Sequence, residues 1–421
     1  MDTEILTLDD FDYQGKTVIL RLDINSPIDR QTGQLADDNR IRKSLPTIRE
    51  LAACGGRVVM LAHQGDTEDY HNLMDLSPHA ARIAELLGHS VSFVDDIAGP
   101  AATGRMSNLR NGELLMLNNV RYLVEEVSTF VKYVKLTPEE MAKTRLVRNL
   151  APHADLYVCE AFSAAHRSTP SLVGFAEVLP AAGGRLFVEE LSALTQVRER
   201  PEHPCVYVLG GARIADAFSM MKSVLGNGSA DKVLTSGLTG EVMLLACGQQ
   251  LGVPSEKLIH DKGLDPYIDK AQDLLNVYAD KILYPSDFAI IDEDQRKEIG
   301  RDKLPVDTLL VDIGAKTIAD YIEVINSART IFVNGPAGIY EQPMSAEGTR
   351  RLWNAIADAP GYSVIGGGDS VAAARRFGVQ ERMGYVCTSG GGMVRFLSGQ
   401  KLPVVEELER AAVRYRARRT E

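Results

Sequence analysis

The sequence predicts an α/β protein with two doubly wound parallel sheets, of the Rossmann-like kind, joined by a hinge helix. The chain has 421 residues, more than one hydrophobic core usually organises. Short strand-like segments, apolar at nearly every position, alternate with helical patterns, which is typical of a parallel sheet covered on both faces. Twelve such segments exceed what one sheet holds comfortably, so we divide them between two domains.

The strand segments follow one another in a regular order. Those of the first half are TVILRLDIN from Thr17, RVVMLAHQ from Arg57, VSFVDD from Val91, ELLMLNNV from Glu113 and ADLYVCEAF from Ala154. Those of the second half are CVYVLGG from Cys205, DKVLTSGL from Asp231, KILYPSDFAII from Lys281, DTLLVDIG from Asp307, TIFVNGPAG from Thr330, YSVIGGGDS from Tyr362 and GYVCTSGGG from Gly384.

The boundary between the domains is predicted from glycine, helical periodicity and proline. Gly183 and Gly184 permit bending, VEELSALTQVRER has the period of a helix, and Pro201 ends it. We therefore expect an N-terminal domain over 1–182, a linker helix over 183–200 and a second domain over 201–402. A last helix over 403–421 is expected to pack back on the first domain.

Composition excludes several classes of partner. The formal net charge of −11 disfavours nucleic acid, which needs a basic surface. No run of about 18 apolar residues is present, so we expect no membrane partner. The five cysteines are scattered, with no C-x-x-C pair, which predicts a reducing, cytoplasmic location without structural zinc.

Glycines end most strand segments of the second domain. They are Gly210 and Gly211, Gly237, Gly314, Gly335, Gly366 to Gly368, and Gly390 to Gly392. The carboxyl ends of parallel strands meet at one edge of a sheet, where helix N-termini face anions. Glycine also serves packing alone in such turns, but the repetition at corresponding strand ends favours a shared surface that binds phosphates.

Polar side chains end the strands of the first domain instead. They are Asp23 and Asn25, His63, Arg121, and His166 with Arg167, and Arg40 follows the first loop. Arginine suits bidentate recognition of a carboxylate or phosphate. Taken singly, Arg40 fits a surface helix and His63 fits a hydrogen-bonded core position. Their convergence at one edge favours an anion site.

The order and spacing of nine motifs resemble those of the phosphoglycerate kinase family, with the archaeal branch nearest. The resemblance covers essentially the whole chain. The motifs are RLDINSP, DDNRIRKSLPTI, LAHQG, LNNVRY, EAFSAAHRSTPSLVGF, LGGARIAD, NGPAGIYE, VIGGGDS and TSGGG followed by LSGQKLP. The resemblance implies two lobes that close like a hinge, and a transferase with a carboxyl acceptor.

The reaction it implies is reversible phosphoryl transfer between 1,3-bisphosphoglycerate and ADP, giving 3-phosphoglycerate and ATP, in glycolysis and gluconeogenesis. It also implies Mg²⁺ on the nucleotide, and a monomer. Phosphoryl transfer depends chiefly on alignment, exclusion of water and positive groups around the phosphoryl.

Site residues carry over from the matching motifs. The substrate-binding residues implied are Asp23, Asn25, Arg40, His63, Arg121 and Arg167. The nucleotide-binding residues implied are Gly210, Gly211, Arg213, Gly237, Asn334, Pro336, Glu341, Gly366, Gly367, Gly368 and Ser370. Asp369 is the implied metal ligand, and Arg40, Arg213, Gly367 and Gly390 are the implied catalytic residues.

Several positions depart from the family pattern, and three of them lie where the family has a lysine or an arginine. Arg213 replaces a lysine, Ala217 replaces a second lysine, and Asp66 replaces an arginine on the glycerate side. An acid at Asp66 repels an anionic substrate unless its loop turns away. Two alternatives therefore stay open: an acyl-phosphate kinase for another small carboxylate, and a non-catalytic paralogue that binds nucleotide or phosphoglycerate.

Overall fold

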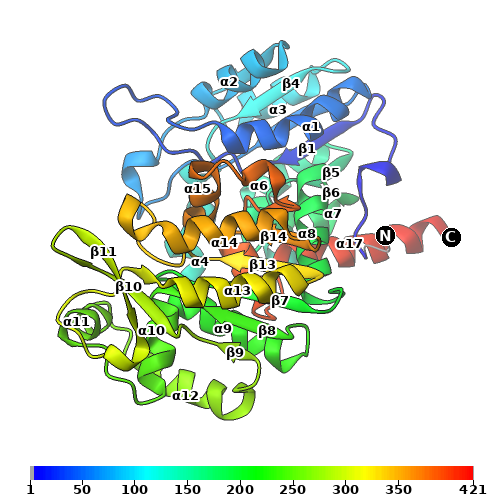
Figure 1. The fold of residues 1–421 in the computed structure, drawn as a ribbon. Coiled ribbons are helices and arrows are strands. Elements are labelled where there is room, and N and C mark those ends of the chain that lie inside the picture. The colour runs from blue at the N-terminus through cyan, green and yellow to red at the C-terminus, as the bar shows by residue number, and fades with distance from the viewer. Residues whose placement is uncertain (1–3, 421) are drawn as a thin grey trace. The chain divides into compact units, whose positions relative to one another are not determined.

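A computed structural model describes residues 4–420, which form two compact units (Figure 1). The first comprises the described residues up to Leu191 and those from Lys401 onward, and the second is Ser192–Gln400. The division falls inside helix α8 (Arg185–Arg198), within the segment expected to link the domains.

The first unit is built on a sheet of six parallel strands, ordered β3-β4-β2-β1-β5-β6. The strands are β1 (Thr17–Arg21), β2 (Arg57–Leu61), β3 (Val91–Val94), β4 (Leu114–Leu117), β5 (Leu156–Cys159) and β6 (Ala181–Gly183). Every residue of the central strand β1 is buried, as its unbroken apolar run requires. Sequence did not predict β6, because three small residues carry no strand pattern.

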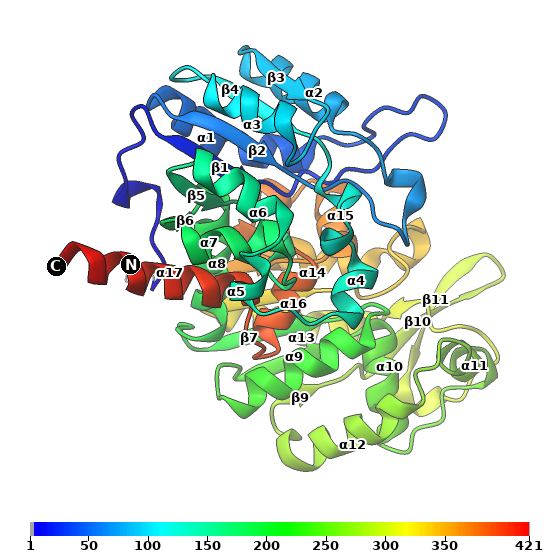
Figure 2. The same cartoon turned by 180° about the vertical axis from the view of Figure 1, so that it is seen from behind.

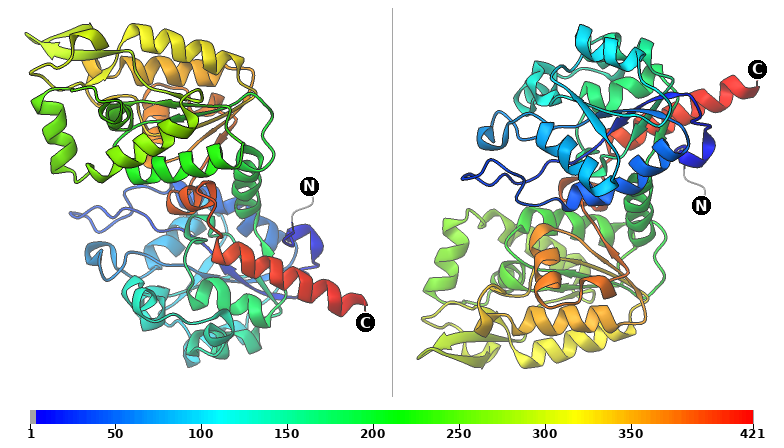
Figure 3. Two further views of the ribbon diagram at one scale, coloured as in Figure 1. Left: turned by 90° about the horizontal axis from the view of Figure 1, so that it is seen from below. Right: turned by 90° about the horizontal axis from the view of Figure 1, so that it is seen from above.

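Helices connect successive strands of this sheet (Figure 2). Their bounds are α1 (Asn39–Ala53), α2 (Ser77–Leu87), α3 (Pro100–Ser107), α4 (Ser128–Tyr133), α5 (Pro138–Met141), α6 (Arg145–Leu150) and α7 (Phe175–Val178). The C-terminal helix α17 (Pro403–Thr420) belongs to this unit and packs against β6 and α7 (Figure 3).

The second unit has its own sheet of six parallel strands, ordered β15-β14-β13-β7-β8-β9. The strands are β7 (Cys205–Leu209), β8 (Lys232–Thr235), β9 (Ile282–Leu283), β13 (Thr330–Asn334), β14 (Tyr362–Ile365) and β15 (Tyr385–Val386). The prediction of two doubly wound parallel sheets is confirmed.

Helices cover both faces of this second sheet. Helices α13 (Ala315–Ser327) and α14 (Glu347–Asp358) lie on the face seen in Figure 1, and α9 (Ile214–Gly226) and α10 (Gly237–Ala246) on the face seen in Figure 2. The remaining helices are α11 (Val253–Asp261), α12 (Pro266–Tyr278), α15 (Gly368–Arg376) and α16 (Gly391–Leu397). No helix among residues 4–420 has the length and apolar character needed to cross a membrane.

A separate antiparallel sheet corrects two of the strand assignments. KILYPSDFAII splits into β9 and β10 (Asp287–Asp292), because Pro285 interrupts the run and has no N–H to pair. β10 pairs with β11 (Gln295–Gly300) and with β12 (Asp312–Ile313), so DTLLVDIG does not enter the parallel sheet. β11 escaped prediction because it is polar. Its tight turn is formed by Glu293 and Asp294, both with positive φ.

Candidate functional site

Six predicted side chains gather at the carboxyl edge of the first sheet. Asp23 and Asn25 follow β1, His63 follows β2, Arg121 follows β4, and Arg167 follows β5. Because β2, β1 and β5 are neighbours and β4 lies beside β2, these strand ends converge. Arg40 joins them from the first turn of α1.

Asp23 anchors one side of this cluster. Its Oδ1 accepts a hydrogen bond from Arg40 Nη1 at 2.8 Å and one from the Asn25 amide at 3.2 Å, and the Ser163 hydroxyl donates to Oδ2. Burial works to raise the pKa of Asp23, but the Arg40 guanidinium and the Ser163 hydroxyl hold it well below its usual range. Asp23 is therefore ionised and orients Arg40, whose side chain stays partly exposed.

His63 is buried, and its ring is oriented by Arg21. Arg21 Nη2 lies 3.1 Å from His63 Nδ1, and a guanidinium can only donate, so Nδ1 accepts and Nε2 carries the ring proton. Burial lowers the pKa of His63 well below its usual value, so the ring is neutral. His63 is thus a hydrogen-bonded core histidine that keeps one N–H donor.

Arg21 is a residue that sequence reasoning missed. It ends the apolar strand β1, is 2% exposed, and donates from Nε to the Ser171 hydroxyl at 2.9 Å. Ser171 in turn donates to the buried carboxylate of Glu126 from its amide at 2.6 Å and its hydroxyl at 2.8 Å. The available signal was a charged residue at the end of a buried, otherwise largely apolar strand.

Asp66 lies among the arginines rather than turning away from them. Its Oδ2 forms an ion pair with Arg121 Nη1 and lies 3.8 Å from Arg167 Nη1. The Ser128 hydroxyl donates to the same oxygen and accepts from Arg167 Nη1 at 2.8 Å. Burial and the neighbouring Arg167 lower the pKa of Arg121 to about 10, so Arg121 remains charged at neutral pH. An internal carboxylate therefore occupies part of the cationic cluster.

The second unit contains two adjoining pockets, with volumes of about 380 Å³ and 290 Å³. They share Gly211, Ala212, Pro336 and Asp369. We name the larger the apolar pocket, since Leu238, Leu258, Phe288, Leu309 and Ile313 contribute to its wall. We name the smaller the glycine pocket, which Gly210, Gly211, Gly335, Gly367, Gly368, Gly390 and Gly391 help to line.

Every predicted nucleotide-binding residue except Gly366 lines one of these pockets. Gly237 and Glu341 line the apolar pocket, Arg213, Asn334 and Ser370 line the glycine pocket, and the implied catalytic Gly367 and Gly390 also lie there. Gly366 lies beneath the surface, where its amide donates to the Val333 carbonyl at 3.1 Å. A Cβ on Gly366 would collide with the Met393 sulfur, so this glycine serves packing.

Several of the strand-end glycines already use their amides. Gly210 donates to the Asn334 carbonyl at 2.9 Å, Gly211 to Pro336 at 2.8 Å, and Gly237 to Ala337 at 3.1 Å. Gly335 has φ +89°, and a Cβ there would collide with the Gly210 carbonyl. These glycines allow the ends of β7, β8 and β13 to touch, and they shape the pocket floor rather than donate to a ligand.

Free amides are supplied instead by the first turn of α15. Gly367 is its N-cap, and the amides that follow it, from Gly368 to Ser370, have no acceptor within the helix. The dipole of α15 adds positive potential at the same point. The Ser370 hydroxyl accepts from the Gly335 amide at 2.7 Å and so ties α15 to the end of β13. This end of the glycine pocket is built to accept an anion.

The departures from the family pattern in this unit concern charge. Arg213 is the N-cap residue of α9 and its side chain is 80% exposed, 3.9 Å from the Asp216 carboxylate. Ala217, one turn later, is buried in the core. Arg395 of α16 lines the glycine pocket and brings a second cation. Sequence reasoning missed Arg395 because GGMVRFL reads as an ordinary helix start.

Asp369 fits a nucleotide-bound Mg²⁺. Its carboxylate is exposed and lines both pockets, and no cluster of three or more metal-ligating side chains occurs among residues 4–420. Magnesium in phosphoryl-transfer sites is held by one or two carboxylates together with substrate phosphates, rather than by a protein cage. A single carboxylate beside an anion-binding helix N-terminus is the donor set that this arrangement needs.

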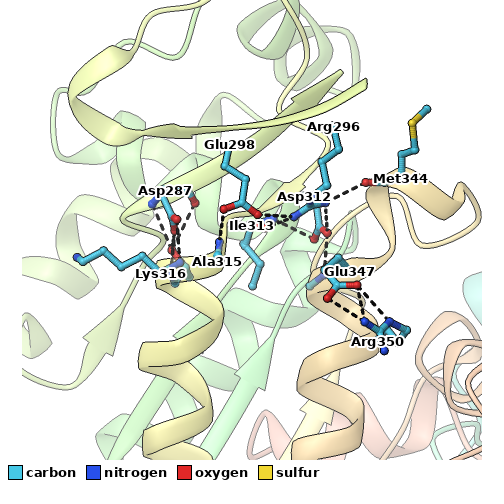
Figure 4. Close-up of polar contacts among 12 residues, drawn as sticks. Asp287, Arg296, Glu298, Asp312, Ile313, Ala315, Lys316, Met344, Glu347 and Arg350 are labelled. Carbon is cyan, nitrogen blue, oxygen red and sulfur yellow. Dashed lines mark hydrogen bonds and ion pairs between the residues drawn. The ribbon is translucent and has the colours of Figure 1, made fainter. Parts of the chain in front are cut away.

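Two other acids near the apolar pocket, Asp312 and Asp287, are structural (Figure 4). Asp312 accepts hydrogen bonds from Arg296 Nη1 at 2.9 Å, the Gly348 amide at 2.7 Å and the Ile313 amide at 2.9 Å. Burial raises the pKa of Asp312 to about 6 despite these donors. Asp287 caps α13 by accepting from the Lys316 amide at 2.9 Å and the Thr317 amide at 2.7 Å. The strand-end glycine Gly314 therefore adjoins an occupied helix N-terminus, not a phosphate site.

Comparisons with known proteins agree on one family. The family model described as phosphoglycerate kinase matches residues 8–400. The phosphoglycerate kinase of Methanothermobacter thermautotrophicus is 42% identical over 403 residues, covering 96% of each chain. That of Methanococcus maripaludis is 42% identical over 408 residues, covering 96% of this chain and 98% of the relative. The crystal structure of phosphoglycerate kinase from Pyrococcus horikoshii OT3 superposes with a TM-score of 0.86 at 36% identity, covering 97% of this chain and all of that one.

Proposed function

The chain belongs to the phosphoglycerate kinase family, and from this premise we propose how its two units share the reaction. The protein is a phosphotransferase that acts on a carboxyl group. It transfers a phosphoryl group reversibly between 1,3-bisphosphoglycerate and ADP, giving 3-phosphoglycerate and ATP. The observation that carries this conclusion is the family match over residues 8–400, which includes both clusters of site residues. That match favours this activity over the two alternatives.

The first unit is proposed to bind the phosphoglycerate. Arg40, Arg121 and Arg167 are cations at one strand edge, and Asp23 orients Arg40 through a 2.8 Å hydrogen bond. The neutral His63 keeps its Nε2–H as a donor for a substrate oxygen. Asn25 completes the set through its position after β1. A substrate with a carboxylate at one end and a phosphate at the other matches this spread of donors.

The second unit is proposed to bind the nucleotide. The first-turn amides of α15 and the cations Arg213 and Arg395 meet at the glycine pocket, which suits phosphates. The apolar pocket continues from it and suits a nucleoside, with Glu341 at its edge for a ribose hydroxyl. Asp369 would hold Mg²⁺, which supplies charge neutralisation to the nucleotide phosphates when it is bound.

In the reaction, the residues of this chain align and stabilise rather than form covalent bonds. Arg213 is exposed at the mouth of the glycine pocket and is proposed to accompany the transferring phosphoryl group. Arg40 is proposed to balance charge on the glycerate side. Preorganised positive groups act strongly on a phosphoryl transition state because its charge is spread over peripheral oxygens.

A coupled assay with 3-phosphoglycerate and MgATP tests this proposal. We expect turnover with 3-phosphoglycerate and none with glycerate, which lacks the phosphate. Arg40→Ala should lose turnover and still bind MgADP, because the nucleotide pockets belong to the other unit. Turnover with a different carboxylate alone would favour the acyl-phosphate kinase, and binding of both substrates without turnover would favour the non-catalytic paralogue.

We also propose a cytoplasmic monomer that works in glycolysis and gluconeogenesis. Support for the compartment comes from the five cysteines, which form no disulfide in the part of the chain described here. Support for both pathways is the reversibility of the reaction. Light scattering behind size-exclusion chromatography tests the monomer, with a mass near 46.0 kDa expected.

A further inference from the structure

Glu241 is a buried acid with no part in the proposed phosphoryl transfer. It lies on α10, is 5% exposed, and lines the apolar pocket. Its Oε2 is buried without a hydrogen-bond partner among the described residues. The other acids of this pocket differ, because Asp312 already accepts three hydrogen bonds and Glu341 and Asp369 are exposed. Among the acids that line the apolar pocket, Glu241 alone combines burial with an oxygen that has no hydrogen-bond partner in the described residues.

Such a group needs a ligand or a special reason to persist. Buried polar atoms in native proteins are almost always hydrogen-bonded, and one without a partner calls for an explanation such as a bound ligand, an ordered water or local strain. Burial raises the pKa of Glu241 to about 8, so the side chain holds its proton at neutral pH. A neutral carboxyl group offers one O–H donor and one carbonyl acceptor side by side.

The position of the pocket limits what the carboxyl group can meet. This step relies on the proposed function, which places the phosphates at the N-terminus of α15 in the glycine pocket. The two pockets share Gly211, Ala212, Pro336 and Asp369, so a nucleotide continues from one into the other. Its base then enters the apolar pocket, beside Leu238, Leu258 and Phe288. Apolar walls hold a flat ring, and a single polar group sets its identity.

We propose that Glu241 hydrogen-bonds the polar edge of the nucleobase and selects a base with an amino donor next to a ring-nitrogen acceptor. Adenine carries this pair of groups on both sides of its amino group, which lies between the ring nitrogens N1 and N7. The carboxyl O–H would donate to the ring nitrogen, and the carboxyl carbonyl would accept from the amino group. Glu241 would therefore be a specificity-determining residue for the nucleotide.

Two diphosphates that differ only at the amino group test the proposal. Titration calorimetry would compare Mg²⁺-ADP with the Mg²⁺-diphosphate of purine riboside, which lacks the amino group. The wild-type protein should bind ADP about tenfold more tightly, as one lost hydrogen bond requires. Glu241→Gln is the matched control, since an amide keeps one donor and one acceptor, and it should retain the preference. Glu241→Met should bind both diphosphates alike.

Equal binding of the two diphosphates by the wild-type protein would overturn the proposal without the need for any variant. Retention of the preference by Glu241→Met would overturn it as well. Mg²⁺-pyrophosphate is the probe for the phosphate site, and its affinity should be the same in all three proteins. The 3-phosphoglycerate assay fails or succeeds independently, because a protein without turnover can still discriminate between the two bases.

Discussion

Neutralising Asp66 should strengthen the binding of 3-phosphoglycerate. The Asp66 carboxylate pairs with Arg121 and lies 3.8 Å from Arg167, the cations proposed for the substrate. A bound phosphate must displace that carboxylate or share the arginines with it. Asp66→Asn keeps the shape of the side chain and removes its charge, so the arginines become available to the substrate.

The magnitude follows from the geometry. Opposite unit charges 3.8 Å apart attract by about 4 kcal/mol at an effective dielectric constant of 20. Arg167 is 36% exposed, so solvent screens much of this attraction, and a net gain of about 1.4 kcal/mol, or tenfold in affinity, is the expected scale. Stability should move the other way, because Arg121 is 3% exposed and would lose its partner at a cost of about 3 kcal/mol.

Calorimetric titration with 3-phosphoglycerate and thermal melts would measure both effects. Asp66→Asn should melt at a lower temperature than the wild type when free and gain more from saturating 3-phosphoglycerate. Glu68→Gln is the matched control, since it removes the same charge from an exposed position of the same loop. If Asp66→Asn binds 3-phosphoglycerate no more tightly than Glu68→Gln does, Asp66 does not compete with the substrate.

Five further variants, at four positions, test the second unit. In initial-rate kinetics, Arg213→Ala should lower kcat about 100-fold with little change in KM, and Arg213→Lys should keep most of the activity. Equal losses in kcat and in substrate affinity would contradict the proposed role of Arg213 in phosphoryl transfer. Arg395→Ala should weaken the binding of MgATP about fivefold, as measured by titration calorimetry. An unchanged affinity would count against a contact between Arg395 and the nucleotide phosphates. Asp369→Ala should abolish the rise in melting temperature given by MgADP. The stability of Glu241→Gln relative to the wild type should increase as pH rises from 5 to 9, by up to roughly 4 kcal/mol in denaturant titrations. The reason is that the carboxyl group of the wild type ionises near pH 4.5 in the unfolded chain but keeps its proton to about pH 8 in the folded protein.

Sequence patterns predicted the parallel sheets because central strands are apolar on both faces. TVILR became β1 and CVYVL became β7, each buried throughout. The failures lie where the pattern is weak. β6 consists of Ala181, Ala182 and Gly183, whose small side chains give no strand signal. β11 is polar because it is exposed, and its pairing with β10 is decided by the hairpin turn rather than by apolar periodicity.

Site residues could be predicted where topology brings strand ends together, and not where a side chain's role depends on its contacts. His63 and Arg121 share an edge because β2 lies beside β4, which a pattern of alternating strands and helices implies. The amides of Gly210 and Gly237, in contrast, donate hydrogen bonds to carbonyls at the end of a neighbouring strand and just beyond it. No spacing rule separates such a glycine from one that binds phosphate. Glu241 is equally invisible, because what sets it apart is a buried oxygen without a hydrogen-bond partner among residues 4–420, which no sequence pattern reveals.

Asp66 also bears on which substrates the first unit can accept. A carboxylate already paired with Arg121 and hydrogen-bonded by Ser128 yields only to an anion that interacts more strongly with both. A phosphate dianion has more charge and more acceptor oxygens than a carboxylate, so it can replace Asp66. A substrate with only a carboxylate would form the same kind of ion pair with the arginines that Asp66 already forms, so it has no advantage over Asp66. Asp66, in place of the family's arginine, therefore weakens the binding of every anion, and it weakens that of acids without a phosphate most. It favours a phosphorylated substrate over the small carboxylates of the alternative kinase.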